Sequence, residues 1–153
     1  MTIIEFTKGA GSRYEAPDVG WIKPKSVFSN DFIGWAAGVG DLVLSRNWSA
    51  TEYTVRDATG RVRGHHERQG WLRQAGPLEW DDVQYEFAVR SGWTTSCVLS
   101  RLNEELATFS AKGVFQRDIE VNPLGGAHVS AGLIVVGVWM FVMRQRDNAA
   151  AAG

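Results

Sequence analysis

The chain has 153 residues, of which 44% are hydrophobic and 22% are charged, a composition typical of one globular domain and not of a disordered or fibrous chain. Sixteen basic residues stand against 17 acidic ones, and the resulting net charge of −1 excludes the strongly basic surface of a nucleic-acid-binding domain. A single cysteine, Cys97, excludes an internal disulfide.

The first residues of the chain, 1–6, have no basic region followed by an apolar one, so they do not resemble a secretory signal. Together with the single cysteine, this favours a cytoplasmic location, with membrane association left open. The chain contains seven tryptophans. Because tryptophan is rarely found on exposed surface, we expect several of them to pack in a core or line a cavity.

Residues 9–24 are rich in Gly, Pro and charge, and they are predicted to be a loop with Trp21 and Ile22 as possible anchors. From Val27 to Ile119 the pattern alternates between strands and turns. The strand candidates are 41–45, 52–56, 61–65, 83–89, 97–100, 106–109 and 114–121.

One hairpin has a clear signal. The segments 52–56 and 61–65 both alternate polar and apolar residues, as half-buried strands do. Between them, Asp57–Gly60 predicts a tight turn in which Gly60 is free to adopt positive φ. A related turn is expected near Asn103.

Two parts of the chain align without gaps at an offset of 45 residues, the difference between Trp35 and Trp80. The same offset places Trp48 on Trp93, and further aligned pairs are Tyr53 with Val98 and Val62 with Ala107. This pattern favours a duplicated β-meander and hence a barrel or a packed pair of sheets. A chance alignment among seven tryptophans is the alternative.

The run from Val129 to Met143 has no charged residue and gives the only clear helix signal. A helix that is apolar on every side is either a membrane span or enclosed by protein. Fifteen residues make about 22 Å of helix, whereas a bilayer core is about 30 Å thick. Arg144 and Arg146 follow the run, and their translocation would oppose the positive-inside tendency. A buried helix is therefore favoured, with a tail anchor as the alternative.

These patterns together predict a mainly β fold. We expect a closed antiparallel barrel, or β-sandwich-like meanders, around a single buried apolar C-terminal helix. Residues 1–147 would form this single domain with 129–143 as its central helix, and 148–153 would be a disordered tail.

The hairpin Tyr53–Val62 with its Asp-x-x-Gly turn, the turn around Asn103 and the apolar helix 129–143 resemble the tubby C-terminal-like superfamily. That superfamily includes the LURP-one-related proteins and the phospholipid scramblases, in which a closed antiparallel barrel wraps around one hydrophobic C-terminal helix. The resemblance covers most of the chain from about Phe32 onward. It implies a non-enzymatic binding or scaffold protein that associates with lipid or a membrane surface.

The best basic cluster comprises Arg61, Arg63, His65, His66 and Arg68, and its arginines on the strand alternate onto one face. Within it, Arg61, Arg63, His65 and Arg68 are the candidate ligand-binding residues, and anionic lipid is the ligand that such a cluster attracts. The alternative is an ordinary solvated strand face.

No catalytic residue, metal site or cofactor is predicted. His65, His66 and Glu67 form the only histidine cluster, but strand neighbours point to opposite faces, and two ligands are fewer than a metal usually takes. Cys97 has no evident base beside it and is expected to be a buried, inert thiol. The side chains of the adjacent residues Asp81 and Asp82 are expected to point in different directions, which argues against a shared role in acid–base catalysis.

Three functions compete at this point. The leading one is a non-enzymatic binding or scaffold protein, whose partner is anionic lipid or another protein and not a nucleic acid. The second is a tail-anchored membrane protein in which 129–143 is the anchor and the β domain binds a partner. The third is a hydrolase-type enzyme, which the absence of a nucleophile-elbow sequence disfavours.

Overall fold

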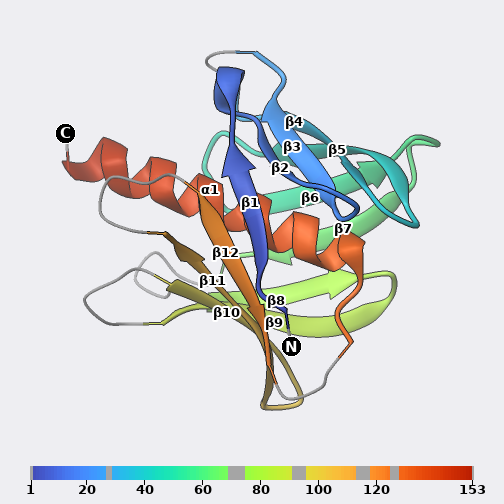
Figure 1. Cartoon of the computed structure of the whole chain (residues 1–153). Helices are drawn as coiled ribbons and strands as arrows, with labels where there is room; N and C mark the ends of the chain where they lie inside the picture. The colour runs from blue at the N-terminus through green and yellow to red at the C-terminus, as the bar shows by residue number, and fades with distance from the viewer. Residues whose placement is uncertain are drawn as a thin grey trace.

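The computed structural model describes residues 2–26, 29–68, 75–90, 96–112, 118–124 and 128–152 (Figure 1). Within these ranges the chain forms strands, one short 3-10 helix and one α-helix. The strands are β1 (Ile4–Lys8), β2 (Tyr14–Ala16), β3 (Gly20–Pro24), β4 (Phe32–Ala36), β5 (Gly40–Arg46), β6 (Glu52–Asp57), β7 (Val62–Glu67), β8 (Ala75–Trp80), β9 (Val83–Arg90), β10 (Ser96–Arg101), β11 (Glu104–Ala111) and β12 (Ile119–Pro123). The helices are η1 (Ala10–Ser12) and α1 (Ala131–Ala152).

The twelve strands form one closed antiparallel barrel. Each strand pairs with its neighbour in sequence, and β1 closes the sheet because it pairs with both β12 and β2. Ile4 lies opposite Val121 on one side of β1, and Thr7 lies opposite Glu15 on the other. Closure leaves the described strands without an open sheet edge that could pair with another chain. The predicted closed barrel is confirmed.

Helix α1 runs through the barrel and forms the centre of its core (Figure 1). Residues 132–143 are all buried, and Trp139 is the largest fully buried side chain among the described residues. A Cβ atom added at Gly137 would lie 2.3 Å from Cζ of Phe109, so glycine at this position lets a β11 ring reach the helix backbone. The apolar run is therefore enclosed by protein, as the buried-helix interpretation predicted.

The helix boundaries differ from the predicted 129–143. Helix α1 begins at Ala131, where the Ser130 hydroxyl accepts a hydrogen bond from the Leu133 N–H at 3.4 Å in the manner of an N-cap. It continues to Ala152 and so includes most of the predicted disordered tail, 148–153. Alanine has the highest helix propensity, which explains why the Ala-rich end extends the helix.

No helix in the described part of the chain is both long enough and apolar enough to cross a membrane.

The direction of α1 defines two ends of the barrel. The end at which the helix begins is called the start end here, and the end at which it leaves the barrel is called the exit end. At the start end, Gly132 lies against the side chains of Trp80 and Val39. At the exit end, Asp147 binds Arg46. Because neighbouring strands are antiparallel, alternate connections lie at the same end. The turn 47–51 between β5 and β6 is therefore at the exit end.

Two hairpins at the start end use turns of two residues. Asp81 and Asp82 join β8 to β9 with φ values of 48° and 64°, and Leu102 and Asn103 join β10 to β11 with φ values of 52° and 65°. Positive φ at both central residues is the type I′ arrangement, whose twist matches that of the flanking strands. The predicted turn at Asn103 is confirmed.

The strands predicted from alternation between 41 and 109 correspond to β5, β6, β7, β9, β10 and β11. The prediction of a loop at 9–24 is wrong, because η1, β2 and β3 lie there. Strand β2 has only three residues and β3 has five, so neither repeats the alternation often enough to give a signal. For the candidate 114–121, only the part from 118 onward lies within the described residues, and it contributes to β12.

The strand order agrees with the 45-residue repeat, since β4–β7 shifted by 45 residues overlap β8–β11. Two of the aligned pairs, Trp35 with Trp80 and Tyr53 with Val98, are nevertheless not equivalent. Trp35 is half-buried on the outer face of β4, whereas Trp80 is in the core with 3% exposure. Tyr53 also points inward while Val98 does not. A one-residue difference in register reverses the face of a strand, so the aligned residues occupy different environments. Trp93 lies outside the described residues.

Candidate functional site

The four predicted ligand-binding residues follow β7 from end to end. Arg61 precedes the strand at the start end, and Arg68 follows it at the exit end. Seven residues of strand span roughly 23 Å. Arg63 and His65 lie between them, half-buried on the outer face. The structure therefore does not bring the four residues together as one compact site, and lipid binding by them stays a prediction.

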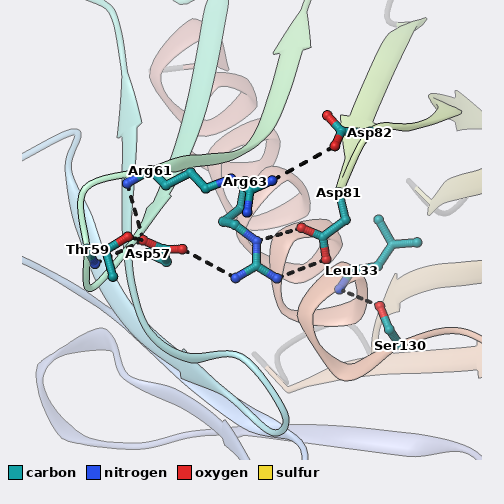
Figure 2. Close-up of polar contacts among 8 residues, drawn as sticks. All are labelled: Asp57, Thr59, Arg61, Arg63, Asp81, Asp82, Ser130 and Leu133. Atoms are coloured by element: carbon teal, nitrogen blue, oxygen red, sulfur yellow. Dashed lines mark hydrogen bonds and ion pairs between the residues drawn. The ribbon is translucent and has the colours of Figure 1, made fainter.

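Arg63 is held by two carboxylates (Figure 2). Its Nε and Nη2 atoms donate to Asp81 at 2.5 and 2.9 Å, and its Nη1 atom donates to Asp57 at 3.4 Å. The guanidinium also lies over the ring of Trp80, 5.6 Å from its centroid. The Arg63 hydrogen bonds hold the pKa of Asp81 below its ordinary value. This network clamps the β6–β7 turn to the β8–β9 turn and neutralises the charge of Arg63.

The predicted Asp57–Gly60 turn is confirmed, and Asp57 is the residue that builds it. Its carboxylate accepts hydrogen bonds from the Thr59 hydroxyl, the Thr59 N–H and the Arg61 N–H at 2.5, 2.9 and 3.2 Å (Figure 2). These bonds, that of the Thr59 hydroxyl above all, lower the pKa of Asp57. Gly60 has φ 85°, as expected. Arg61 makes a long ion pair of 3.9 Å with Asp82, and both side chains are exposed.

His65 and His66 face opposite sides of β7, as the strand geometry predicted. His66 points into the core with 4% exposure, and its Nδ1 atom donates to the carbonyl oxygen of Pro77 at 2.9 Å. Burial lowers its pKa to about 4, so the ring is neutral at pH 7. Among the described residues, no group of three or more His, Cys, Asp or Glu side chains is placed to hold a metal ion.

Cys97 is fully buried in β10, and burial raises the pKa of its thiol to about 12. Nucleophilic cysteines have the opposite properties, a lowered pKa and access to solvent. The described geometry therefore fits an inert core thiol.

A group of charged side chains surrounds α1 where it leaves the barrel; it comprises Arg46, Arg68, Arg144 and Asp147 and is called the exit cluster here. The Arg46 Nη1 atom donates to both carboxylate oxygens of Asp147 at 2.8 and 2.9 Å, and the Arg46 side chain is only 8% exposed. Its guanidinium lies 5.8 Å from the centroid of the Tyr53 ring.

Arg144, on α1, is a further cation of the exit cluster. It is half-buried, and none of the ion pairs among the described residues involves it. Burial lowers the pKa of its guanidinium, and the nearby positive charge of Arg68 lowers it further. The segments outside the described residues contain no Asp or Glu side chain in the sequence. Arg144 therefore contributes a positive charge in a partly dehydrated position, where an added anion is favoured.

Trp48 also lies at the exit end and is 93% exposed. The Asn47 side chain fixes its turn, because Oδ1 accepts the N–H groups of Thr51 and Glu52 at 2.9 and 3.0 Å while Nδ2 donates to the Thr51 hydroxyl at 2.9 Å. Trp80 and Trp139 are in the core, as expected for several tryptophans. Trp48 instead belongs to a well-built turn that presents its indole to solvent.

Sequence reasoning missed Arg46, Trp48 and Arg144 as possible functional residues. Arg144 is the first charge after the apolar run, and this position is the one signal that could have indicated it.

Comparison of the chain with protein-family models, with curated proteins and with solved structures found no match.

Proposed function

We propose that this chain is a non-enzymatic binding protein of tubby-like kind that associates with an anionic membrane surface through the exit end of its barrel. The observation that carries the proposal is that the exposed indole of Trp48 lies at the same end as the positively charged exit cluster. The family resemblance, which rests on sequence alone, supports lipid as the partner.

Trp48 supplies the apolar part of this association. Indole rings favour the interface between lipid headgroups and acyl chains, because one part of the ring is apolar and its N–H remains hydrated. The hydrogen bonds of Asn47 hold the turn in place before any contact is made. A preorganised anchor loses less conformational entropy on binding than a flexible one.

The exit cluster supplies the electrostatic part. Arg144 supplies a half-buried positive charge there, and it belongs to none of the ion pairs among the described residues. Each cation near an anionic membrane surface contributes about 1 kcal/mol of attraction, and salt screens this term. The predicted face contributes less, because Arg63 is paired with Asp57 and Asp81 at the other end of the strand.

A flotation assay tests this function. Full-length protein is mixed with vesicles of phosphatidylcholine alone or of phosphatidylcholine containing 30 mol% phosphatidylserine (about a third, to give a clear surface potential), at low and high salt. We expect flotation only with the anionic vesicles and a decrease at high salt.

Two exposed apolar residues give a matched comparison. Trp48→Ala should reduce flotation with anionic vesicles, whereas Leu102→Ala should not, because Leu102 is 89% exposed at the start end. Arg144→Gln should weaken the salt dependence. Equal flotation with both vesicle types, or no difference between the Trp48 and Leu102 variants, would reject the proposal.

A further inference from the structure

An apolar patch lies on the outer face of the barrel, over the neighbouring strands β3, β4 and β5 (Figure 1). It comprises Trp21, Ile33, Trp35 and Val43 and is called the β3–β5 patch here. Trp21 lies opposite Trp35 on the next strand. Ile33, two residues from Trp35, lies opposite Val43. Val43 is 40% exposed, the other three are half-buried, and none of the four belongs to the core.

Charged side chains border this patch, and each of two rows across the strands carries one sign of charge. The row that contains the two tryptophans lies nearer the start end and continues to Glu15 on β2 and Asp41 on β5. The row that contains the two aliphatic side chains lies nearer the exit end; it contains Lys23 on β3 and ends at Arg56 on β6. Asp41 and Arg56 are exposed, and none of the ion pairs among the described residues involves either of them. The outer face therefore has an acidic half and a basic half.

This arrangement is complementary to itself. In a dimer with one two-fold axis, a residue of the first copy contacts a different residue of the second, and the reverse contact also forms. An axis that runs across the strands, between the two rows, places the acidic row of one copy on the basic row of the other. Trp35 then packs on the partner's Ile33. Asp41 lies one strand interval, about 4.8 Å, to the side of the partner's Arg56, a distance that these two side chains span.

Glu15 and Lys23 make a second pair of the same kind, because they too lie on adjacent strands in opposite rows. Glu15 is also bound by Arg13 of its own chain, at 3.4 Å. Exposed ion pairs of this type are weak, so Glu15 can be shared between Arg13 and the partner's Lys23. The contact between Asp41 and the partner's Arg56 has no such competitor and is therefore the better one to test.

We propose that the β3–β5 patch is the interface of a homodimer in which the strands of the two copies run in opposite directions. The apolar side chains form its centre, and the two charged rows fix its orientation, because any other alignment would bring like charges together. The face is convex and about 19 Å wide from β2 to β6, so it buries less than the roughly 800 Å² per partner of a standard interface. A reversible dimer of micromolar affinity is expected. The interface uses neither Trp48 nor the exit cluster, so it does not depend on the membrane association proposed above.

Sedimentation equilibrium of the full chain, from micromolar to submillimolar concentration, tests the proposal. We expect a monomer–dimer equilibrium that weakens at high salt, because the charged rows lie at the solvated rim. Asp41→Arg and Arg56→Asp should each weaken dimerisation at least tenfold, since each places like charges against one another twice in the dimer.

Mixing these two variants gives the decisive measurement. The Asp41→Arg chain carries cations at both positions, and the Arg56→Asp chain carries carboxylates at both. Each chain alone should stay monomeric, whereas the mixture should form a heterodimer about as readily as the native chain forms its homodimer. Restored association cannot come from a folding defect, so the mixture separates loss of the interface from loss of the fold.

Two exposed valines give the matched control for the apolar centre. Val43→Lys should abolish dimerisation, whereas Val62→Lys should leave it unchanged, because Val62 is 45% exposed on β7, outside the patch. A native chain that stays monomeric at every concentration would overturn the proposal. A mixture that stays monomeric, or equal effects of the two valine substitutions, would also overturn it.

Discussion

Trp139 of α1 and Tyr53 of β6 meet edge to face inside the barrel, with ring centroids 5.4 Å apart and ring planes inclined by 72°. Tyr53 also contacts His66, which contacts Phe87, which contacts Phe109. Phe109 returns to the helix at Gly137. These rings form a continuous arc that begins at α1, includes one side chain from each of four strands and returns to α1. We expect substitutions in the helix and in this arc to be energetically coupled.

Gly137→Ala tests the closest contact of that arc. A Cβ atom at this position would lie 2.3 Å from Cζ of Phe109, and the ring is fully buried. Overpacking costs about 1–3 kcal/mol and should outweigh the gain of about 1 kcal/mol from helix propensity. Denaturant unfolding should therefore show a loss of stability. The double variant Gly137→Ala/Phe109→Leu should be more stable than the sum of the single losses predicts, and strict additivity would contradict the contact.

His66 should make the protein less stable in acid. Its pKa falls from 6.5 in the unfolded chain to about 4 in the fold, so between these values the unfolded state binds the extra proton. Stability is therefore fully present above pH 6.5 and decreases as the pH falls toward 4. The expected total is about 3 kcal/mol.

The measurement for His66 is the free energy of unfolding between pH 4 and 7. His66→Gln, which cannot ionise, should flatten the dependence. His65→Gln, one residue away and on the outer face, should leave it unchanged. Equal pH profiles for the native chain and His66→Gln would show that His66 does not contribute.

Removing α1 should abolish the cooperative unfolding transition. The Leu, Ile, Val, Trp, Met and Phe side chains of 133–143 are at most 4% exposed, and each contributes about 1.5–3 kcal/mol when fully buried. Their sum exceeds a typical total stability of about 5–15 kcal/mol. A chain ending at Pro123 should show no cooperative thermal transition. A chain ending at Asn148 keeps the buried turns of α1 and should retain the cooperative thermal transition. Cooperative unfolding of the shorter chain would contradict the role of α1 as core.

A substitution in the β10–β11 turn should increase the stability of the protein. Leu102 adopts φ 52° while 89% exposed, and the left-handed region costs a residue such as leucine about 1–2 kcal/mol. Leu102→Asn should therefore raise the melting temperature, because asparagine tolerates this conformation. Leu102→Ala removes the same exposed apolar surface without this relief. Equal gains from the two variants would show that the effect comes from removing the exposed leucine side chain and not from relief of the backbone.

The sequence was most informative where one pattern extended over many residues. The charge-free run that ends at Met143 predicted the enclosed helix, and the Asp57–Gly60 turn predicted its hairpin. Short strands such as β2 were not predicted, because three residues cannot display a period. The tail was missed because its alanines suggested fraying, although their helix propensity continues α1.

The candidate sites were less predictable, because they depend on tertiary contacts. Arg63 has the same local pattern as a free surface arginine, and only the fold places Asp81 beside it. The exit cluster joins Arg46 to Asp147, which lie 101 residues apart in the sequence. No local pattern reports that two such residues share a surface.

The seam between β1 and β12 has a consequence for synthesis of the chain. Ile4 of β1 pairs with Val121 of β12, so this pairing cannot form until 117 further residues (121 − 4) have been synthesised. The interior of the barrel is filled only when α1 follows. At about 5–20 residues per second, a ribosome takes roughly 6–23 s to synthesise that interval. During this time the earlier strands expose apolar faces of the kind that holding chaperones bind. The domain therefore completes its folding only after residue 143 has left the exit tunnel.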